Sequence, residues 1–143
     1  MKHHIFAISL IVALCSAASP ALADVTVADT ETYTVRVHAP AASAGKKSAA
    51  TVSITPKKGW KLNLEFPTKL VVEPPTGASV DKKKQKKADA ASFSEKKGAI
   101  WRVVFTANKA GKNTFSADLK FAMCSSATCD PKRETFRFDV GVK

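Results

Sequence analysis

Apolar and polar residues alternate with a period of two in several separate runs of this chain. In the run at residues 100–107, Trp101, Val103 and Phe105 fall in phase. Successive side chains of a β-strand point to opposite faces, so this alternation predicts strands with one buried face. Similar runs predict strands at residues 32–38, 51–55, 61–66, 114–123 and 135–142, and a short apolar run predicts another at 70–73.

Clusters of proline, glycine and lysine separate these runs, for example at residues 56–59, 74–77 and 96–98. Such clusters are typical of turns. About seven or eight short strands in one chain predict an all-β fold, an immunoglobulin-like antiparallel β-sandwich, with a small β-barrel as the alternative. The 143-residue length and the hydrophobic content of 45% fit a single domain, which we place at residues 24–143.

The first segment, residues 1–23, has the three parts of a secretory signal peptide. Lys2 supplies the positive start, residues 5–15 are apolar apart from one serine, and Ala21 and Ala23 form a small-x-small cleavage site. We expect cleavage near Ala23 and a periplasmic or secreted mature protein. A retained membrane anchor is one alternative, and acylation of Cys15 is another, although Leu14 stands where that signal needs a small residue.

The chain is basic, with 23 Lys and Arg against 12 acidic residues and a formal net charge of +11. Export makes nucleic acid an unexpected partner despite this charge. The charge is densest in a lysine run that must be solvent-exposed. This run could protect a sheet edge, attract an anionic membrane surface or steer an acidic protein partner. It comprises Lys82, Lys83, Lys84, Lys86 and Lys87.

Cys124 and Cys129 are the sharpest chemical feature, because an exported chain favours their oxidation to a disulfide. Cys124 ends a predicted strand, and Cys129 stands two residues before Pro131 and the last strand. A hairpin would bring the two within disulfide reach. The closed loop is short, and a bridge of this loop length contributes about 2 kcal/mol in the chain-entropy model.

The spacing leaves a structural bridge and a redox-active pair both open. Lys132 and Arg133 lie close in sequence and could stabilise a thiolate. A third interpretation, Cu(I) bound by Met123 and the two cysteines, is weak because no histidine is near. We therefore expect no metal site and no cofactor.

Two motifs resemble a known family. Cys124-x4-Cys129-x-Pro131, late in an exported β-rich domain, resembles the N-terminal periplasmic domain of the thiol:disulfide interchange protein DsbD and the related stand-alone disulfide bond corrector domains. A second segment, KGWKLNLEFP at residues 58–67, is similar to the family's Gly-aromatic segment ahead of an extended strand. The resemblance covers roughly residues 33–142.

This resemblance implies an immunoglobulin-like sandwich and a cysteine pair that cycles between dithiol and disulfide. It also implies periplasmic thioredoxin-like partners and an aromatic-tipped cap loop over the cysteines, for which Phe93 is the candidate. We expect the chain to need a separate reductant.

Two functional hypotheses follow. In the first, the chain is a periplasmic thiol–disulfide exchange module, in which Cys129 attacks or is attacked and Cys124 resolves the mixed disulfide. In the second, it is a non-enzymatic binding module with a structural bridge and a basic face for a membrane surface or an acidic protein.

Overall fold

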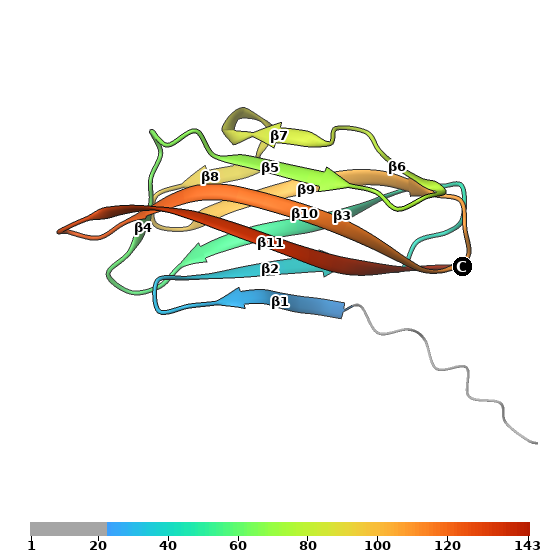
Figure 1. The fold of residues 1–143 in the computed structure, drawn as a ribbon, viewed down its shortest axis with the longest axis horizontal. Helices are drawn as coiled ribbons and strands as arrows, with labels where there is room; N and C mark the ends of the chain where they lie inside the picture. Colours follow the sequence, from blue (N-terminus) through green and yellow to red (C-terminus); the bar gives the residue numbers. More distant parts are fainter. Residues whose placement is uncertain (1–22) are drawn as a thin grey trace, which may run out of the picture.

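A computed structural model describes residues 23–143, which form a sandwich of two antiparallel sheets (Figure 1). The predicted signal peptide, apart from Ala23, lies outside the described residues. The first sheet contains β1 (Ala23–Asp29), β2 (Tyr33–Ala39), β3 (Lys47–Pro56), β9 (Gly98–Ala107) and β6 (Ala78–Val80) in that order, with β8 (Ser92–Ser94) also paired to β9. The second contains β11 (Cys129–Val142), β10 (Gly111–Cys124), β5 (Lys69–Glu73) and β7 (Lys84–Lys86), with β4 (Lys61–Leu62) also paired to β10.

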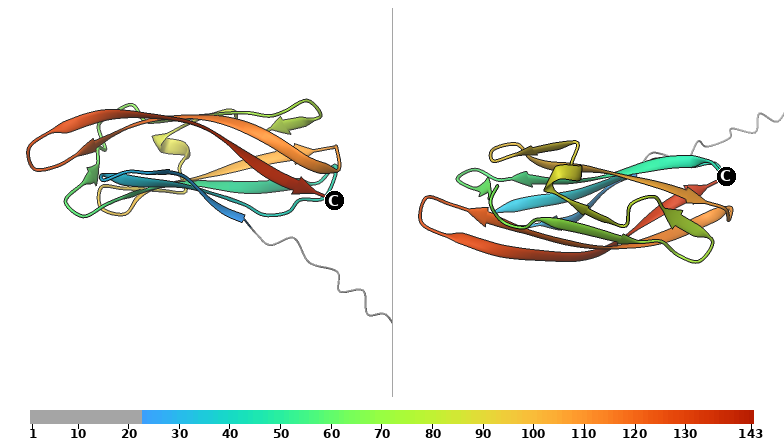
Figure 2. Two further views of the ribbon diagram at one scale, coloured as in Figure 1. Left: turned by 60° about the horizontal axis from the view of Figure 1, so that its bottom comes forward. Right: turned by 90° about the horizontal axis from the view of Figure 1, so that it is seen from above.

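The two sheets lie face to face (Figure 2), and the side chains on their inner faces form one apolar core. Trp101 and Phe105 from the first sheet are fully buried, as are Phe115 and Phe121 from the second. The rings of Phe105 and Phe115 meet across the layers with centroids 5.1 Å apart. Burial of large aromatic side chains supplies much of the stability of such a core.

The predicted antiparallel sandwich is confirmed, and the barrel alternative is wrong, because β1, β7 and β11 leave the two sheets with open edges. The predicted number of strands was too low, since the described residues contain eleven. Four of the additional or shortened strands, β4, β6, β7 and β8, have only two or three residues. A strand that short carries no measurable period-two pattern.

The strand predicted at residues 61–66 is wrong beyond its first two residues, because β4 ends at Leu62. Asn63 ends it: its side-chain oxygen accepts hydrogen bonds from the backbone N–H groups of Glu65 (2.8 Å) and Phe66 (3.2 Å). Asparagine side chains compete with sheet ladders in this way. Leu64 and Phe66 therefore leave the predicted strand face and become half-buried outside the sheet.

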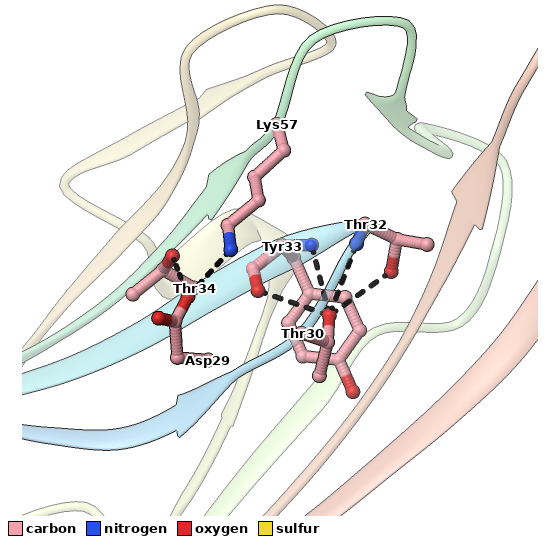
Figure 3. A network of polar contacts seen from close by, with 6 residues as sticks. All are labelled: Asp29, Thr30, Thr32, Tyr33, Thr34 and Lys57. Atoms are coloured by element: carbon pink, nitrogen blue, oxygen red, sulfur yellow. Dashed lines mark hydrogen bonds and ion pairs between the residues drawn. The ribbon is translucent and has the colours of Figure 1, made fainter.

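The turn between β1 and β2 is held by polar side chains (Figure 3). The Thr30 hydroxyl oxygen accepts hydrogen bonds from the backbone N–H groups of Thr32 and Tyr33 at 3.2 and 3.0 Å. The Lys57 ammonium and the Thr34 hydroxyl both donate to Asp29, which holds the pKa of the Asp29 carboxyl below its usual value. These contacts fix the edge of the first sheet at the end where the cysteine hairpin lies.

Strands β10 and β11 form a long hairpin whose tip projects beyond the other strands at one end of the sandwich (Figures 1 and 2). Their ladder pairs fourteen residues of each strand, from Gly111–Val142 at one end to Cys124–Cys129 at the other. Tyr33 ties the first sheet to this hairpin, because its hydroxyl donates to the Glu134 carboxylate. Burial of Tyr33 and this hydrogen bond both raise its pKa.

We predict that Gly98→Ala lowers the free energy of unfolding by about 3 kcal/mol or more. Gly98 has φ +85°, and an added Cβ would lie 1.8 Å from the Ile54 carbonyl oxygen. Gly59 is a matched control, because it has the same φ with nothing within 4 Å of the added atom. Gly59→Ala should cost only about 1–2 kcal/mol, from the left-handed conformation. Urea unfolding of both variants measures the difference, and equal costs would contradict the steric argument.

Candidate functional site

The candidate site lies at the tip of the β10–β11 hairpin, where Cys124 ends one strand and Cys129 begins the other. The two residues are directly paired in the ladder, with their Cα atoms 4.0 Å apart, and they form a disulfide. The predicted disulfide is therefore confirmed. Because disulfides persist in oxidising compartments, the bond favours an exported protein.

Hydrogen bonds also close the turn of this hairpin. The backbone N–H of Ser125 donates to the Thr128 carbonyl oxygen at 2.7 Å. The Ser125 hydroxyl oxygen accepts from the backbone N–H groups of Ala127 and Thr128, both at 3.2 Å. With the ladder extending up to this turn, the bridge adds a covalent link where the backbone is already closed by hydrogen bonds.

The two cysteines differ in exposure. Cys129 is exposed, whereas Cys124 is half-buried. Thiol–disulfide exchange needs an attacking thiolate to reach one sulfur of the bond. The exposed Cys129 is thus the more accessible of the two bridged residues.

Beside the bridge lies a shallow hollow of about 270 Å³, lined by both cysteines together with Lys61, Asn63 and Glu95. Lys61 reaches this position because β4 pairs with β10, with Lys61 directly opposite Cys124. Residues directly opposite in a sheet point to the same face. The half-buried cysteine therefore lies between the exposed cysteine on one neighbouring strand and a lysine on the other.

Glu95 modifies the charge at this position. Its Oε2 atom lies 4.0 Å from Lys61 Nζ, and both side chains are about half exposed, at 51% and 56%. The backbone fixes the two segments together, since the Leu62 N–H donates to the Glu95 carbonyl oxygen at 2.8 Å. A lysine and a glutamate of opposite charge thus line the same hollow as the disulfide.

The basic residues predicted from sequence to support the cysteines lie elsewhere. Lys132 is three positions from Cys129 along β11, which places its side chain on the opposite face of the sheet. Arg133 shares the face of the disulfide but lies about 13 Å along the strand. Its guanidinium pairs with Asp118, with Nε and Nη2 at 2.7 and 2.6 Å from Oδ2. Sequence proximity singled out these two residues and missed Lys61.

Phe93, the candidate for a cap, packs against the core instead of lining the hollow beside the cysteines. Its ring meets the buried Trp101 edge to face at a centroid distance of 6.0 Å. Lys87 Nζ lies over the same ring, 5.5 Å from its centroid. Phe93 therefore helps anchor the β8–β9 hairpin, which in turn carries Glu95 to the hollow.

The lysine run lies at an edge of the second sheet, as one sequence interpretation expected. Lys84 and Lys86 are exposed on β7, which lies at the end of the strand order among residues 23–143 and pairs there with β5. Gln85 between them is buried and donates to the Arg102 carbonyl oxygen at 3.2 Å. Trp101 Nε1 donates to the Lys86 carbonyl oxygen at 3.0 Å, so the edge strand is fixed to the core.

Within residues 23–143 no group of three or more His, Cys, Asp or Glu side chains could hold a metal ion. No helix in that part of the chain is long and apolar enough to cross a membrane.

The fold and the site together define a disulfide-bonded β-sandwich domain. No family model matches the chain, and no curated protein matches it. The GAE domain of GGA2p from Saccharomyces cerevisiae is similar in structure, with a TM-score of 0.52 and 8% sequence identity. The match covers 81% of this chain and 97% of that one. At this identity the likeness shows the fold alone.

Two further solved structures are more distant. The N-terminal periplasmic domain of ScsB from Proteus mirabilis has a TM-score of 0.47 and 12% identity, and the match covers 82% of this chain and 50% of that one. The fimbrial major subunit AggA from Escherichia coli has a TM-score of 0.38 and 11% identity, over 78% and 94% of the two chains. Likenesses this distant support no inference about function.

We predict that Lys61→Gln slows reduction of the disulfide by glutathione about two- to threefold, because the leaving Cys124 thiolate loses a neighbouring positive charge. Glu95→Gln should have the opposite effect, since it removes the carboxylate beside Lys61. Lys132→Gln is the control, because it removes the same charge from the opposite face of the sheet, and it should leave the rate of reduction unaltered. Stopped-flow measurement of reduction checks all three variants. Equal slowing by Lys61→Gln and Lys132→Gln would show that only net charge matters.

Proposed function

We propose that this protein is an exported thiol–disulfide exchange module that uses Cys124 and Cys129 as its redox pair. The observation that carries the proposal is the position of the disulfide at an exposed hairpin tip that the backbone ladder and the Ser125 turn already close. A bridge whose purpose is stability gains more by closing a longer loop. The placement favours access to the bond over stabilisation by it.

In this proposal the two cysteines react in a defined order. A partner thiolate attacks the exposed Cys129 sulfur, a partner–Cys129 disulfide forms, and the Cys124–Cys129 bond breaks with Cys124 leaving as a thiolate. A second thiol of the partner then attacks the mixed disulfide and releases Cys129 as a thiolate. The partner becomes oxidised, and the two cysteines gain two electrons and, at equilibrium, up to two protons. The reverse sequence passes the electrons on to another protein.

Lys61 is the residue that we propose to favour the leaving Cys124 thiolate. Opposite charge beside a thiolate stabilises it relative to the thiol. Glu95 reduces that effect and gives the site a moderate rather than an extreme thiolate stabilisation. In this scheme Lys132 and Arg133 have no direct role, because they lie on the other face and in an ion pair with Asp118 respectively.

The proposed compartment is the periplasm, reached through the signal peptide predicted at residues 1–23. The resemblance of the Cys124-x4-Cys129-x-Pro131 motif to the DsbD N-terminal domain supports a thioredoxin-like partner. Thioredoxin-like proteins carry a dithiol that cycles with a disulfide, which matches the two-electron step described above.

We predict a reduction potential of the Cys124–Cys129 pair between about −120 and −270 mV, the range of known exchange proteins. Equilibration of the purified protein against thiol buffers, followed by alkylation and mass analysis, measures it. A bond that stays closed below about −300 mV would contradict the exchange function. The protein would then be a binding module with a structural bridge.

We also predict that a Cys124→Ala variant accumulates a mixed disulfide through Cys129 when mixed with a thioredoxin-like protein that keeps only one of its two active cysteines, activated as a mixed disulfide with thionitrobenzoate, so that no second partner thiol can release Cys129. The exposed Cys129 can attack the partner, and the resolving thiol is gone. Cys129→Ala is the matched control, and it should form at least about tenfold less adduct because Cys124 is half-buried. Non-reducing electrophoresis quantifies both adducts. Equal trapping by the two variants would contradict the assignment of Cys129 as the accessible sulfur.

A further inference from the structure

A second, larger hollow lies on the outer face of the sheet that carries the disulfide. Its volume is about 810 Å³, within the range of sites that bind small molecules. Leu64, Phe66, Pro67 and Ala88 contribute apolar side chains to its wall. Two of these, Leu64 and Phe66, are the residues that Asn63 diverts from the predicted strand.

Five lysines also line this hollow, and three of them form a row across the sheet. Lys120 on β10 is directly opposite Lys69 on β5, and Lys69 is directly opposite Lys86 on β7. Lys84 and Lys87 complete the set. Lys87 Nζ donates to the Leu64 carbonyl oxygen at 2.8 Å and so helps hold the apolar wall over the sheet.

The lysines of this row have no direct ion-pair partner among the described residues, although Glu65 also lines the hollow. Within the described part of the chain, Lys69, Lys84, Lys86 and Lys120 have no carboxylate oxygen within 4.0 Å of the ammonium. The neighbouring lysines of the same run differ, since Lys82 pairs with Asp89 and Lys83 pairs with Glu73. Within this run, the lysines without an ion-pair partner are thus the ones that line the hollow.

Edge protection does not explain the row. Lys69 and Lys120 lie on β5 and β10, which have neighbouring strands on both sides. Both side chains are half-buried. Like charges directly opposite each other in a sheet destabilise it. Like charges that destabilise the interior of a sheet indicate that the residues serve another purpose. Arrangements that lower stability in this way concentrate at functional sites.

We propose that this hollow binds a small anionic amphiphile, with its apolar chain or ring against Leu64 and Phe66 and its anionic head at the lysine row. Apolar walls with a few convergent polar groups are typical of ligand sites. The apolar side chains line a concavity, whereas contact with a bilayer would need them to protrude. The proposal does not depend on the exchange function, although Leu64 and Glu65 line both hollows.

The test uses decanoate as the probe, with isothermal titration calorimetry on the purified protein. We expect saturable binding that weakens about tenfold in the double variant Lys69→Gln/Lys120→Gln, which removes two of the three charges of the row, those on β5 and β10. The control Lys47→Gln/Lys83→Gln loses the same charge from ion pairs outside the hollow and should bind like the unmodified protein. Decanol and decyltrimethylammonium should bind at least about tenfold more weakly.

A second measurement separates loss of the site from loss of the fold. Because the double variant removes directly opposed like charges, its thermal unfolding midpoint should rise by about 1 to 4 °C while decanoate binding falls. Absence of saturable decanoate binding, equal binding of decanol, or equal weakening by the control pair would each overturn the proposal. Binding to phosphatidylglycerol vesicles without binding to free decanoate would also overturn it and assign the lysine row to a membrane surface.

Discussion

The long antiparallel ladder of β10 and β11 is the constraint on which the rest of the second sheet depends. It carries the disulfide at one end, supplies β10 as the strand to which β4 and β5 pair, and presents Phe115, Phe121 and Phe138 to the core. Antiparallel register fixes the face of every side chain, because a shift by one residue would invert them all. The fourteen paired positions therefore determine at once which residues are buried and which surround the cysteines.

Most of this ladder could be predicted from sequence. Alternation of large apolar residues at residues 114–123 and 135–142 reported one buried face, and the same pattern located the strand that carries Trp101. The cysteine pairing also followed, since two cysteines that flank a short turn in a hairpin fall opposite each other. The cysteine pairing depends on residues close together in the chain. The strands depend on the burial of alternate side chains, which a period-two pattern indicates directly.

The surroundings of the disulfide could not be predicted in the same way. Lys61 lies more than sixty residues from Cys124 in sequence, and only the pairing of β4 with β10 brings them opposite each other. The Asn63 side chain ends β4, because it accepts backbone hydrogen bonds that would otherwise belong to the sheet ladder. The alternation of Leu62, Leu64 and Phe66 predicted a continuous strand and gave no sign of this end. Proximity along the chain instead pointed to Arg133, whose charge Asp118 compensates.

The departure at Asn63 connects the two sites physically. After it leaves the sheet, the segment that follows supplies the apolar wall of the larger hollow, and its first residues border the disulfide. Leu64 and Glu65, which follow Asn63, line both hollows. The Lys120–Lys69–Lys86 row then stands where a regular sheet would favour opposite charges or β-branched pairs. Both candidate sites therefore include residues that one local interaction displaces from the sheet, the hydrogen bonds that the Asn63 side chain accepts from the backbone of Glu65 and Phe66.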